Sequence, residues 1–401
     1  MTINNEHKKL NVPNLRFKEF QEEWEKTKFG DIATGFDYGM NAAAKNYDGV
    51  NKYIRITDID EASSTYTDKD IVSPDGVLTD NYLVNNRDIL LARTGASTGK
   101  SYLYKKSDGK LYFAGFLIRA NVTTHDPYFV FSQLHTHRYW RWVSIMSARS
   151  GQPGINSQEY SSFPIYTTSI EEESKIAKLL SLLDKRIATQ NKIIEDLKKL
   201  KSAIIDYAIN SLDSGFVKFG SLYEMAGEGG TPTTSNASFY DNGKIPFVKI
   251  DDLKQKYLTE NKDFITELGL QKSSAWLVPT HSILFSNGAT IGEITITTYP
   301  VCTKQGILGI VPKQNIDVEF LYYFMSSSYF KKAVSRIVTE GTMKTAYLKD
   351  INNILCPIPT KEKQQEIAKI PSALNSKIDF EQSILKLFCS QKQYLLRQMF
   401  I

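Results

Sequence analysis

The sequence predicts an α+β fold in which two duplicated α/β domains are separated by two long helical regions, which pair as an antiparallel coiled coil with pseudo-two-fold symmetry. Two observations predict this fold. The second half of the 401-residue chain repeats the first at an offset of 190 to 194 residues. Apolar residues also recur at heptad spacing at the end of each half.

The composition indicates an ordinary globular protein of two to three domains. Apolar residues make up 41% of the chain and charged residues 23%, which excludes disordered, collagen-like and disulfide-scaffold proteins. The formal net charge of +5 and a pI near 8.7 permit an anionic partner but do not require one. Any basic surface must therefore be local.

The sequence features that bear on location predict a soluble cytoplasmic protein. The polar segment 1–13 lacks the form of a signal peptide, and no run of 18 apolar residues occurs. Cys302, Cys356 and Cys389 are far apart and form no C-x-x-C pair. We therefore expect core thiols in a reducing compartment.

The repeated elements begin with a short motif and a strand. Lys28-Phe29-Gly30 returns as Lys218-Phe219-Gly220, and the alternating pattern at 53–59 returns at 247–253. That alternation is typical of a half-buried strand, here followed by acidic residues. Each half then carries a strand and a glycine loop, 89–99 in the first and 282–292 in the second, with the same separation between the two glycines.

The later repeated elements are an aromatic helix and a proline-bearing strand. We expect the helices at 128–143 and 319–334. Phe163-Pro164-Ile165 then matches Cys356-Pro357-Ile358. The repeats predict four parts, which are residues 1–165 (N-terminal segment and first α/β domain), 166–212 (central helical region), 213–358 (second α/β domain) and 359–401 (C-terminal helical region).

The heptad seams predict the helical pairing. In both halves the apolar positions step by four and three, with polar interruptions at matching places, Gln190 with Glu381 and Lys201 with Lys392. A seam of about thirty-three residues is ~50 Å long at 1.5 Å per residue. Pro371 interrupts the second seam, where we expect a kink or a restarted helix. The apolar pairing positions are Ile176, Leu180, Leu183, Ile187, Ile194, Leu197, Ile204, Leu374, Ile378, Leu385, Phe388 and Leu395.

Three motifs resemble catalytic sites, and each has a structural alternative. Gly95 to Ser101 resembles a phosphate-binding loop, but three residues rather than four separate its glycines. Asp75, Asp108 and Lys110 could form a metal-dependent nuclease site, although Asp108-Gly109 is also a hairpin signal. His135 and His137 could ligate a metal, but on a helix they point to different faces. The sequence therefore predicts no catalytic residue and no metal ligand in this chain.

The remaining chemistry is binding by polar side chains on loops beside strands. Arg, Lys, Asn and Gln read purine edges, Asp accepts from cytosine, and Ser and Thr hold phosphates. These loops differ between halves whose glycines and apolar residues agree, as two copies reading different sequences would. The candidate DNA contacts are Arg55, Thr57, Asp58, Arg93, Thr94, Ser97, Lys100, Gln152, Lys249, Asp251, Asp252, Asn287, Thr290, Lys304, Gln305 and Lys344.

The chain resembles the specificity subunit of type I restriction-modification systems over nearly its whole length. The most specific stretch runs from Gly230-Thr231-Pro232 to Asp251-Asp252-Leu253 and is similar to the opening of that family's target-recognition domain. The entries to the helical regions, from Pro164-Ile165 and Pro357-Ile358-Pro359, are also similar. The first half departs from the pattern, because Ile32 to Phe36 lacks the Gly-Thr-Pro signature.

The resemblance implies a non-catalytic subunit in which each target-recognition domain reads one half of a split double-stranded DNA site. The helical regions would set the spacing and dock two methylation subunits, and two motor-nuclease restriction subunits would complete the complex. Adenine methylation and cleavage would belong to those partners. S-adenosylmethionine, ATP and magnesium would be their cofactors, and this chain would need none.

Two other classes of function stay open at this point. One is a self-contained nuclease that uses Asp75, Asp108 and Lys110. The other is a scaffold whose domains bind peptides. Magnesium-dependent cleavage by the isolated chain would favour the first, and association insensitive to salt would favour the second.

Overall fold

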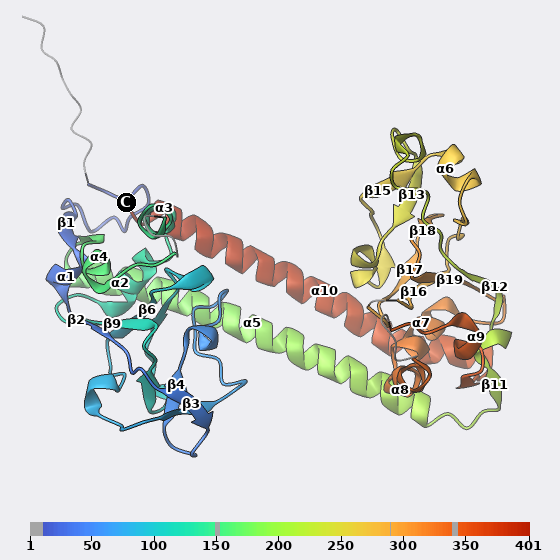
Figure 1. Ribbon diagram of the computed structural model, residues 1–401, viewed down its shortest axis with the longest axis horizontal. Coiled ribbons are helices and arrows are strands. Elements are labelled where there is room, and N and C mark those ends of the chain that lie inside the picture. The colour runs from blue at the N-terminus through green and yellow to red at the C-terminus, as the bar shows by residue number, and fades with distance from the viewer. Residues whose placement is uncertain (1–10, 149–152, 289, 339–343) are drawn as a thin grey trace, which may run out of the picture. The chain divides into compact units, whose positions relative to one another are not determined.

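The computed structural model describes residues 11–148, 153–288, 290–338 and 344–401 (Figure 1). The chain forms two compact units. The first unit comprises residues 1–191 and 383–401, and the second comprises residues 192–382. Both long helices run from one unit into the other, so the division does not test the four predicted boundaries, which stay a prediction.

The first unit is a mixed α/β structure around a four-stranded antiparallel sheet in the order β2-β9-β6-β7. Smaller pairings are β3 with β5, β4 with β8 and β1 with β10. Its strands are β1 Glu25–Lys28, β2 Ala33–Tyr38, β3 Ala43–Asn46, β4 Lys52–Ile54, β5 Val72–Asp75, β6 Asp88–Ala92, β7 Ser101–Leu103, β8 Leu111–Phe113, β9 Leu117–Val122 and β10 Pro164–Thr167. Its short helices are α1 Phe29–Ile32, α2 Pro127–Gln133, α3 His137–Ser147 and α4 Ser157–Ser161.

The second unit repeats this arrangement around a sheet in the order β12-β19-β16-β17-β14. A second sheet has the order β15-β13-β18, and β11 pairs with β20. Its strands are β11 Phe216–Lys218, β12 Tyr223–Glu228, β13 Ile245–Val248, β14 Tyr257–Leu258, β15 Asp263–Ile265, β16 Ile283–Ser286, β17 Ile294–Thr297, β18 Cys302–Thr303, β19 Ile307–Pro312 and β20 Leu355–Pro357. Its short helices are α6 Glu267–Gln271, α7 Val318–Ser326, α8 Ser328–Ile337 and α9 Leu348–Ile351.

The strand order confirms that the halves are duplicates. The run β2-β9-β6-β7 corresponds to β12-β19-β16-β17, and the parallel pair β4-β8 corresponds to the parallel pair β13-β18. In each unit the first and last strands close the domain by pairing antiparallel, β1 with β10 and β11 with β20. Asp108-Gly109 is not a hairpin turn, because β7 and β8 on either side of it pair with different strands.

The two predicted aromatic helices are each two helices. A hydroxyl residue caps the second helix of each pair, since Thr136 Oγ1 accepts from the Tyr139 N–H and Ser327 Oγ accepts from the Phe330 N–H. The chain can therefore turn between α2 and α3 and between α7 and α8. Both pairs bury aromatic rings in the domain core, including Phe129, Tyr139, Phe320 and Phe330.

The long helices are α5, Ile170–Asn210, and α10, Lys361–Gln398, with 41 and 38 residues. Each therefore extends beyond its predicted seam. All the predicted pairing positions are buried or half-buried, whereas most of their neighbours on the helices are exposed. Pro371 does not restart α10, because the helix continues through it, and the proline is itself buried.

Within each unit the two long helices pair antiparallel. In the first unit Lys392 Nζ lies 2.6 Å from Asp184 Oδ1, and Leu396 and Met399 share a core with Leu180. In the second unit Lys201 Nζ donates to Asn375 Oδ1 at 2.9 Å, and Ala368 shares a core with Ile205. Asp184 and Asn375 are repeat equivalents, as are Lys201 and Lys392. Both units therefore use the same pair with the helices exchanged, as the pseudo-two-fold prediction requires.

A buried ionic cluster fixes the start of α5 in the first unit. The fully buried Glu172 carboxylate accepts from Arg16 Nε and Nη2, both at 2.7 Å, from Thr168 Oγ1 at 2.7 Å and from Trp24 Nε1 at 3.3 Å. Its neighbour Glu173 lies 2.8 Å from His125 Nδ1. These contacts tie the N-terminal segment and the β9–α2 connection to one helix turn.

A second buried cluster in the second unit joins the sheet to α7 and α10. The buried Lys256 side chain forms an ion pair with Glu319 and donates to Ser372 Oγ at 3.0 Å. Burial raises the pKa of the Glu319 carboxyl, but hydrogen bonds from Lys256, Tyr257 and Ser372 outweigh it and hold that pKa below its usual value. The ammonium group also lies 4.8 Å from the Tyr323 ring centroid.

The cysteine prediction is confirmed for two of the three residues. Cys302 and Cys356 are buried free thiols, and burial raises the pKa of each, to about 11 and about 12. Cys389 is exposed on α10, so the expectation that it is a core thiol was wrong. It occupies a position between two seam residues, where a small side chain faces outward. Within the described residues, no helix is both long and apolar enough to cross a membrane.

Candidate nucleic-acid interface

The loop after β4 brings together three of the predicted DNA contacts. Arg55 Nη2 donates to Asp58 Oδ1 at 2.8 Å and to Asp70 Oδ2 at 3.1 Å, while Asp58 Oδ2 accepts from the Arg55 N–H at 2.8 Å. The bond to Asp58 is the main reason that the pKa of Arg55 is raised. Asp58 is only 6% exposed, whereas Thr57 is exposed. Asp58 therefore supports the loop in this structure.

The loop after β13 uses the same local bonds in the second unit. Asp252 Oδ2 accepts from the Lys249 N–H at 2.9 Å, as Asp58 does from Arg55. Lys249 Nζ also lies 2.7 Å from Asp263 Oδ1, and the exposed Asp251 pairs with Lys254 at 2.9 Å. The two halves thus share a capped turn and differ in the side chains that the turn presents.

The glycine loop of the first unit carries Arg93, Thr94, Ser97 and Lys100. Its N–H groups donate inside the protein, since Gly95 donates to the Pro153 carbonyl, Gly99 to Ala92 and Lys100 to Ser97. Lys100 Nζ lies 3.1 Å from Glu61 Oε2. These hydrogen bonds account for the conformation of the loop, whose glycine spacing differs from that of a phosphate-binding loop. Ser97 is half-buried, and the predicted contact Gln152 lies outside the described residues.

Arg93 lies between two exposed aromatic rings that sequence reasoning missed. Its guanidinium carbon is 4.9 Å from the Tyr38 ring centroid and 5.9 Å from that of Phe116, and its Nε donates to the Gly115 carbonyl at 2.9 Å. Tyr38 and Phe116 are 44% and 59% exposed. An available signal was Gly115-Phe116, an aromatic residue at a turn directly before β9.

The equivalent of Arg93 in the second unit is Asn287. The Arg93 N–H donates to the carbonyl of Phe116, the residue before β9, and the Asn287 N–H donates to the carbonyl of Gly306, the residue before β19. The Arg93 carbonyl accepts from the Ile155 N–H, and the Asn287 carbonyl accepts from the Ala346 N–H. The sequence alignment had placed Ser286 opposite Arg93. The structural equivalence shifts by one residue because the second loop is one residue shorter between its strand and its second glycine.

Asn287 is 2% exposed, and its Nδ2 donates to the Ala346 carbonyl at 3.3 Å. Its Nδ2 is therefore used inside the domain. Thr290, Lys304, Gln305 and Lys344 are exposed. Contact with DNA stays a prediction for all the candidate residues, which are Arg55, Thr57, Asp58, Arg93, Thr94, Ser97, Lys100, Gln152, Lys249, Asp251, Asp252, Asn287, Thr290, Lys304, Gln305 and Lys344.

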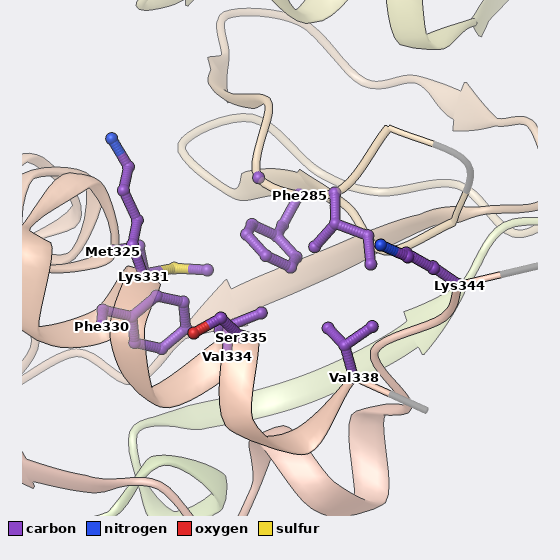
Figure 2. A pocket seen from close by; sticks show the side chains of 10 residues that line it. Phe285, Met325, Phe330, Lys331, Val334, Ser335, Val338 and Lys344 are labelled. Carbon is purple, nitrogen blue, oxygen red and sulfur yellow. The ribbon is translucent and has the colours of Figure 1, made fainter. Parts of the chain in front are cut away.

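A pocket of 430 Å³ lies beside this loop in the second unit (Figure 2). Its apolar lining includes Phe285, Met325, Phe330 and Val338, and Figure 2 shows the Lys344 side chain extending toward Phe285. The structure thus brings Lys344 to the same hollow as Ile291 and Gly292 of the glycine loop.

The first unit fills the equivalent space with larger side chains. Tyr139 OH donates to the Gly99 carbonyl at 2.8 Å and Tyr160 OH to the Ala92 carbonyl at 2.6 Å. A Cβ on Gly99 would lie 3.0 Å from Trp140. In the second unit Phe330 corresponds to Tyr139, Ile351 to Tyr160 and Lys331 to Trp140. A Cβ on Gly292 would have no neighbour within 4 Å. The two domains therefore differ in side-chain size beside the glycine loops.

The structure gives local explanations for the motifs that resemble catalytic sites. Asp75 lies 3.7 Å from Lys45 Nζ, and Asp108 Oδ2 accepts from Tyr102 OH at 2.6 Å. Lys110 Nζ lies 5.4 Å from the Tyr112 ring. The described residues contain no group of three His, Cys, Asp or Glu side chains placed to hold a metal ion.

The histidine pair is also used locally. His135 Nδ1 lies 2.9 Å from the Phe131 carbonyl and Nε2 lies 2.9 Å from Ser64 Oγ. Burial, with a smaller effect of Lys392, lowers the pKa of His135 to about 4. His137 begins α3 directly after its Thr136 cap. Both ring nitrogens of His135 are therefore already paired within the fold.

An apolar groove lies between α5 and α10 in the first unit. Its cavity volume is 590 Å³, and its lining includes Leu179, Leu182, Leu183, Phe388 and Leu395. Lys185 and Arg186 add positive charge at its edge. Leu179 and Leu182 are exposed, although they lie next to seam residues that are buried.

Comparison with known proteins identifies the class to which this fold belongs. The type I restriction modification DNA specificity domain matches the chain twice, at residues 21–199 and 212–387. The chain belongs to this family and carries two copies of its domain.

Individual relatives agree with this assignment. The chain is 25% identical, over 94% of its length and 92% of the relative's, to the putative type I restriction enzyme MjaX specificity subunit of Methanocaldococcus jannaschii. It is 26% identical to the EcoR124I/EcoR124II specificity subunit of Escherichia coli, over 48% of this chain and 50% of that one. Its fold is similar to the crystal structure of the type I S subunit from M. genitalium, with a TM-score of 0.58, 17% identity, and coverage of 97% and 99% of the two chains.

Proposed function

We propose that this chain is the non-catalytic DNA-specificity subunit of a type I restriction-modification complex. Each unit's recognition domain would bind one half of a bipartite double-stranded DNA target. The observation that carries the proposal is the duplicated scaffold with different loop residues, because a shared strand order with Arg93 on the glycine loop of one copy and the exposed Thr290 on that of the other suits two different base sequences.

The helical pair would set the gap between the two half-sites. The support is the length and continuity of the helices, since α5 has 41 residues and a helix rises about 1.5 Å per residue, giving ~60 Å. A continuous helix that enters both units is stiff compared with a loop of similar length. Each unit also locks the two helices together through a polar pair and a shared core.

The exposed apolar residues of the helices would dock two methylation subunits. The groove lined by Leu179, Leu182 and Phe388 offers apolar surface without a partner among the described residues, and such patches are typical of protein interfaces. Two motor-nuclease restriction subunits would join this complex. Adenine methylation with S-adenosylmethionine, and DNA cleavage with ATP and magnesium, would take place on the partners in the cytoplasm, and this chain itself would hold no cofactor.

A domain exchange tests the modular part of this proposal. Residues 17–150 are replaced by the corresponding segment of a relative, and the complex is expressed with its methylation subunit. The expected result is a new sequence in one half of the methylated site, with the other half and the gap unchanged, because the second unit supplies its own sheet and loops. Sequencing of methylated DNA reads this directly. A change in both halves would contradict independent reading by the two domains.

A further inference from the structure

Resting on the proposed function, we propose that Arg93 reads a guanine in the half-site bound by the first unit, and that Tyr38 and Phe116 are positioning residues that hold its guanidinium for this contact. The ligand is thus the major-groove edge of a G·C base pair. The inference rests on the surroundings of Arg93, on a contrast with the other basic residues and on a contrast with the second unit.

The surroundings of Arg93 fix one end of the guanidinium and leave the other available. The group lies between the Tyr38 and Phe116 rings, and Nε is held by the Gly115 carbonyl at 2.9 Å. Neither Nη forms a hydrogen bond or ion pair with another described residue. Since both flanking rings are exposed, this site lies at the protein surface. The rings restrict the side chain before any partner arrives, which lowers the entropy cost of binding.

Three other basic side chains of the first unit have carboxylate partners. Arg55 pairs with Asp58 and Asp70, Lys100 pairs with Glu61, and Arg119 pairs with Asp37 at 2.9 Å. Arg119 is a close comparison, because its guanidinium also lies over a ring, 5.2 Å from the Phe113 centroid. Its Nη1 and Nη2 are nevertheless both occupied, by the Leu83 carbonyl and by Asp37.

The second unit replaces the whole arrangement and not the arginine alone. Strand register makes Glu228 the equivalent of Tyr38, since Tyr38 pairs with Ile118 and Glu228 with Leu308. Gly306 stands where Phe116 stands, and Glu228 Oε1 accepts from its N–H at 2.9 Å. Without aromatic walls, the equivalent of Arg93 is the buried Asn287. Arginine and both rings therefore occur together in one copy and are absent together from the other.

The chemistry of the available edge favours guanine. Two Nη groups in one plane match the O6 and N7 acceptors of guanine in the major groove, which is the commonest specific contact between arginine and DNA. A phosphate would also accept from arginine, but a phosphate contact carries no sequence information. Removal of the guanine N7 atom weakens binding if Arg93 contacts the base, but not if it contacts a phosphate.

The experiment measures binding of the complex of this chain with its methylation subunit to duplexes carrying the mapped target. Each guanine in the first unit's half-site is replaced in turn by 7-deazaguanine, which lacks the N7 acceptor but pairs normally. For the natural chain we expect one position at which binding weakens roughly fivefold to a hundredfold. For Arg93→Gln we expect at least as large a loss on the unmodified duplex, because both the O6 and the N7 contacts are removed, and no further loss from 7-deazaguanine.

Two further variants separate positioning from folding. Phe116→Ala keeps the arginine and is expected to lose part of the selectivity at the same base pair. Arg119 also lies over an aromatic ring, but its Nη1 and Nη2 donate to groups of the protein. Arg119→Gln is therefore expected to leave the recognised sequence unchanged. The 7-deazaguanine measurement on the natural chain needs no variant, so it can overturn the inference even if a variant fails to fold.

The inference is overturned if the half-site contains no guanine, or if no 7-deazaguanine position weakens binding by the natural chain. It is also overturned if Arg93→Gln weakens all sequences equally while the 7-deazaguanine effect persists, because that result identifies a phosphate contact. If the chain directs methylation to no split sequence, both the proposed function and this inference are wrong. If it directs methylation to a split sequence but 7-deazaguanine does not weaken its binding, only the role of Arg93 is wrong.

Discussion

Leu180→Ala is expected to lower the free energy of unfolding by about 3 to 5 kcal/mol, because it opens a cavity in a well-packed core. Leu180 is 1% exposed and belongs to the same buried cluster as Phe129 of α2 and Leu396, Met399 and Phe400 at the end of the chain. Its loss weakens the contact between α5, α10 and the first domain at once. Urea unfolding of the full chain measures the effect.

Leu179→Ala is the matched control, since it removes the same atoms one residue away. Leu179 is 37% exposed and lines the groove between the helices. We expect a loss of less than about 1 kcal/mol in the free energy of unfolding. Affinity for the methylation subunit should fall instead, if the groove docks that subunit. Equal destabilisation by both variants would contradict the assignment of a buried seam and an exposed docking face.

Glu172→Ala is expected to be similarly severe, at about 3 to 5 kcal/mol, because it leaves a buried cation without its partner. Arg16 loses both of its 2.7 Å bonds to the carboxylate, and Trp24 Nε1 and Thr168 Oγ1 lose their acceptor. The N-terminal segment around Arg16 should detach from α5. Proteolysis near Arg16 and the free energy of unfolding both report this change.

Glu171→Ala provides the control for charge and helix position. Glu171 precedes Glu172 in the first turn of α5 but is exposed. Its removal costs less than about 1 kcal/mol, the usual size of a surface charge near a helix N-terminus. If the two variants were equally stable, the buried cluster would not be what fixes the start of α5.

Repeated patterns predicted the parts of the fold that depend on local spacing. The shared glycines and apolar strands predicted the duplicated sheet order, and the heptad spacing predicted the burial of residues such as Leu180 and Ile378. Lys201 and Lys392 aligned in the sequence as matching interruptions, and the structure pairs them with equivalent residues of the opposite helix. Spacing along a helix determines these features, so the sequence alone contains them.

Features that depend on distant partners could not be predicted in this way. Arg16 and Glu172 are 156 residues apart in the chain, and nothing in either neighbourhood indicates the pair. The hydroxyls of Thr136 and Ser327 divide the predicted aromatic helices, because a side-chain cap competes locally with apolar periodicity.

The exposed side chains of the predicted binding site also depend on distant parts of the chain. Equal glycine spacing placed Ser286 opposite Arg93, whereas the backbone bonds to Gly306 and Ala346 make Asn287 the equivalent. Tyr38 and Phe116 have the character of core residues in the sequence, and only the tertiary fold shows that they are exposed. The sequence thus predicted the loops correctly as the places where the halves differ, but not which side chains they expose.

The measurement that tests the central claim most directly is a map of methylated adenines in cells that carry this chain with its methylation subunit. Two domains on one continuous helical pair should give a single split sequence, with two different halves and the same number of intervening base pairs at every methylated site. A continuous recognition sequence, or a gap that varies between sites, would contradict the claim that two separate domains read DNA at a distance set by the helices.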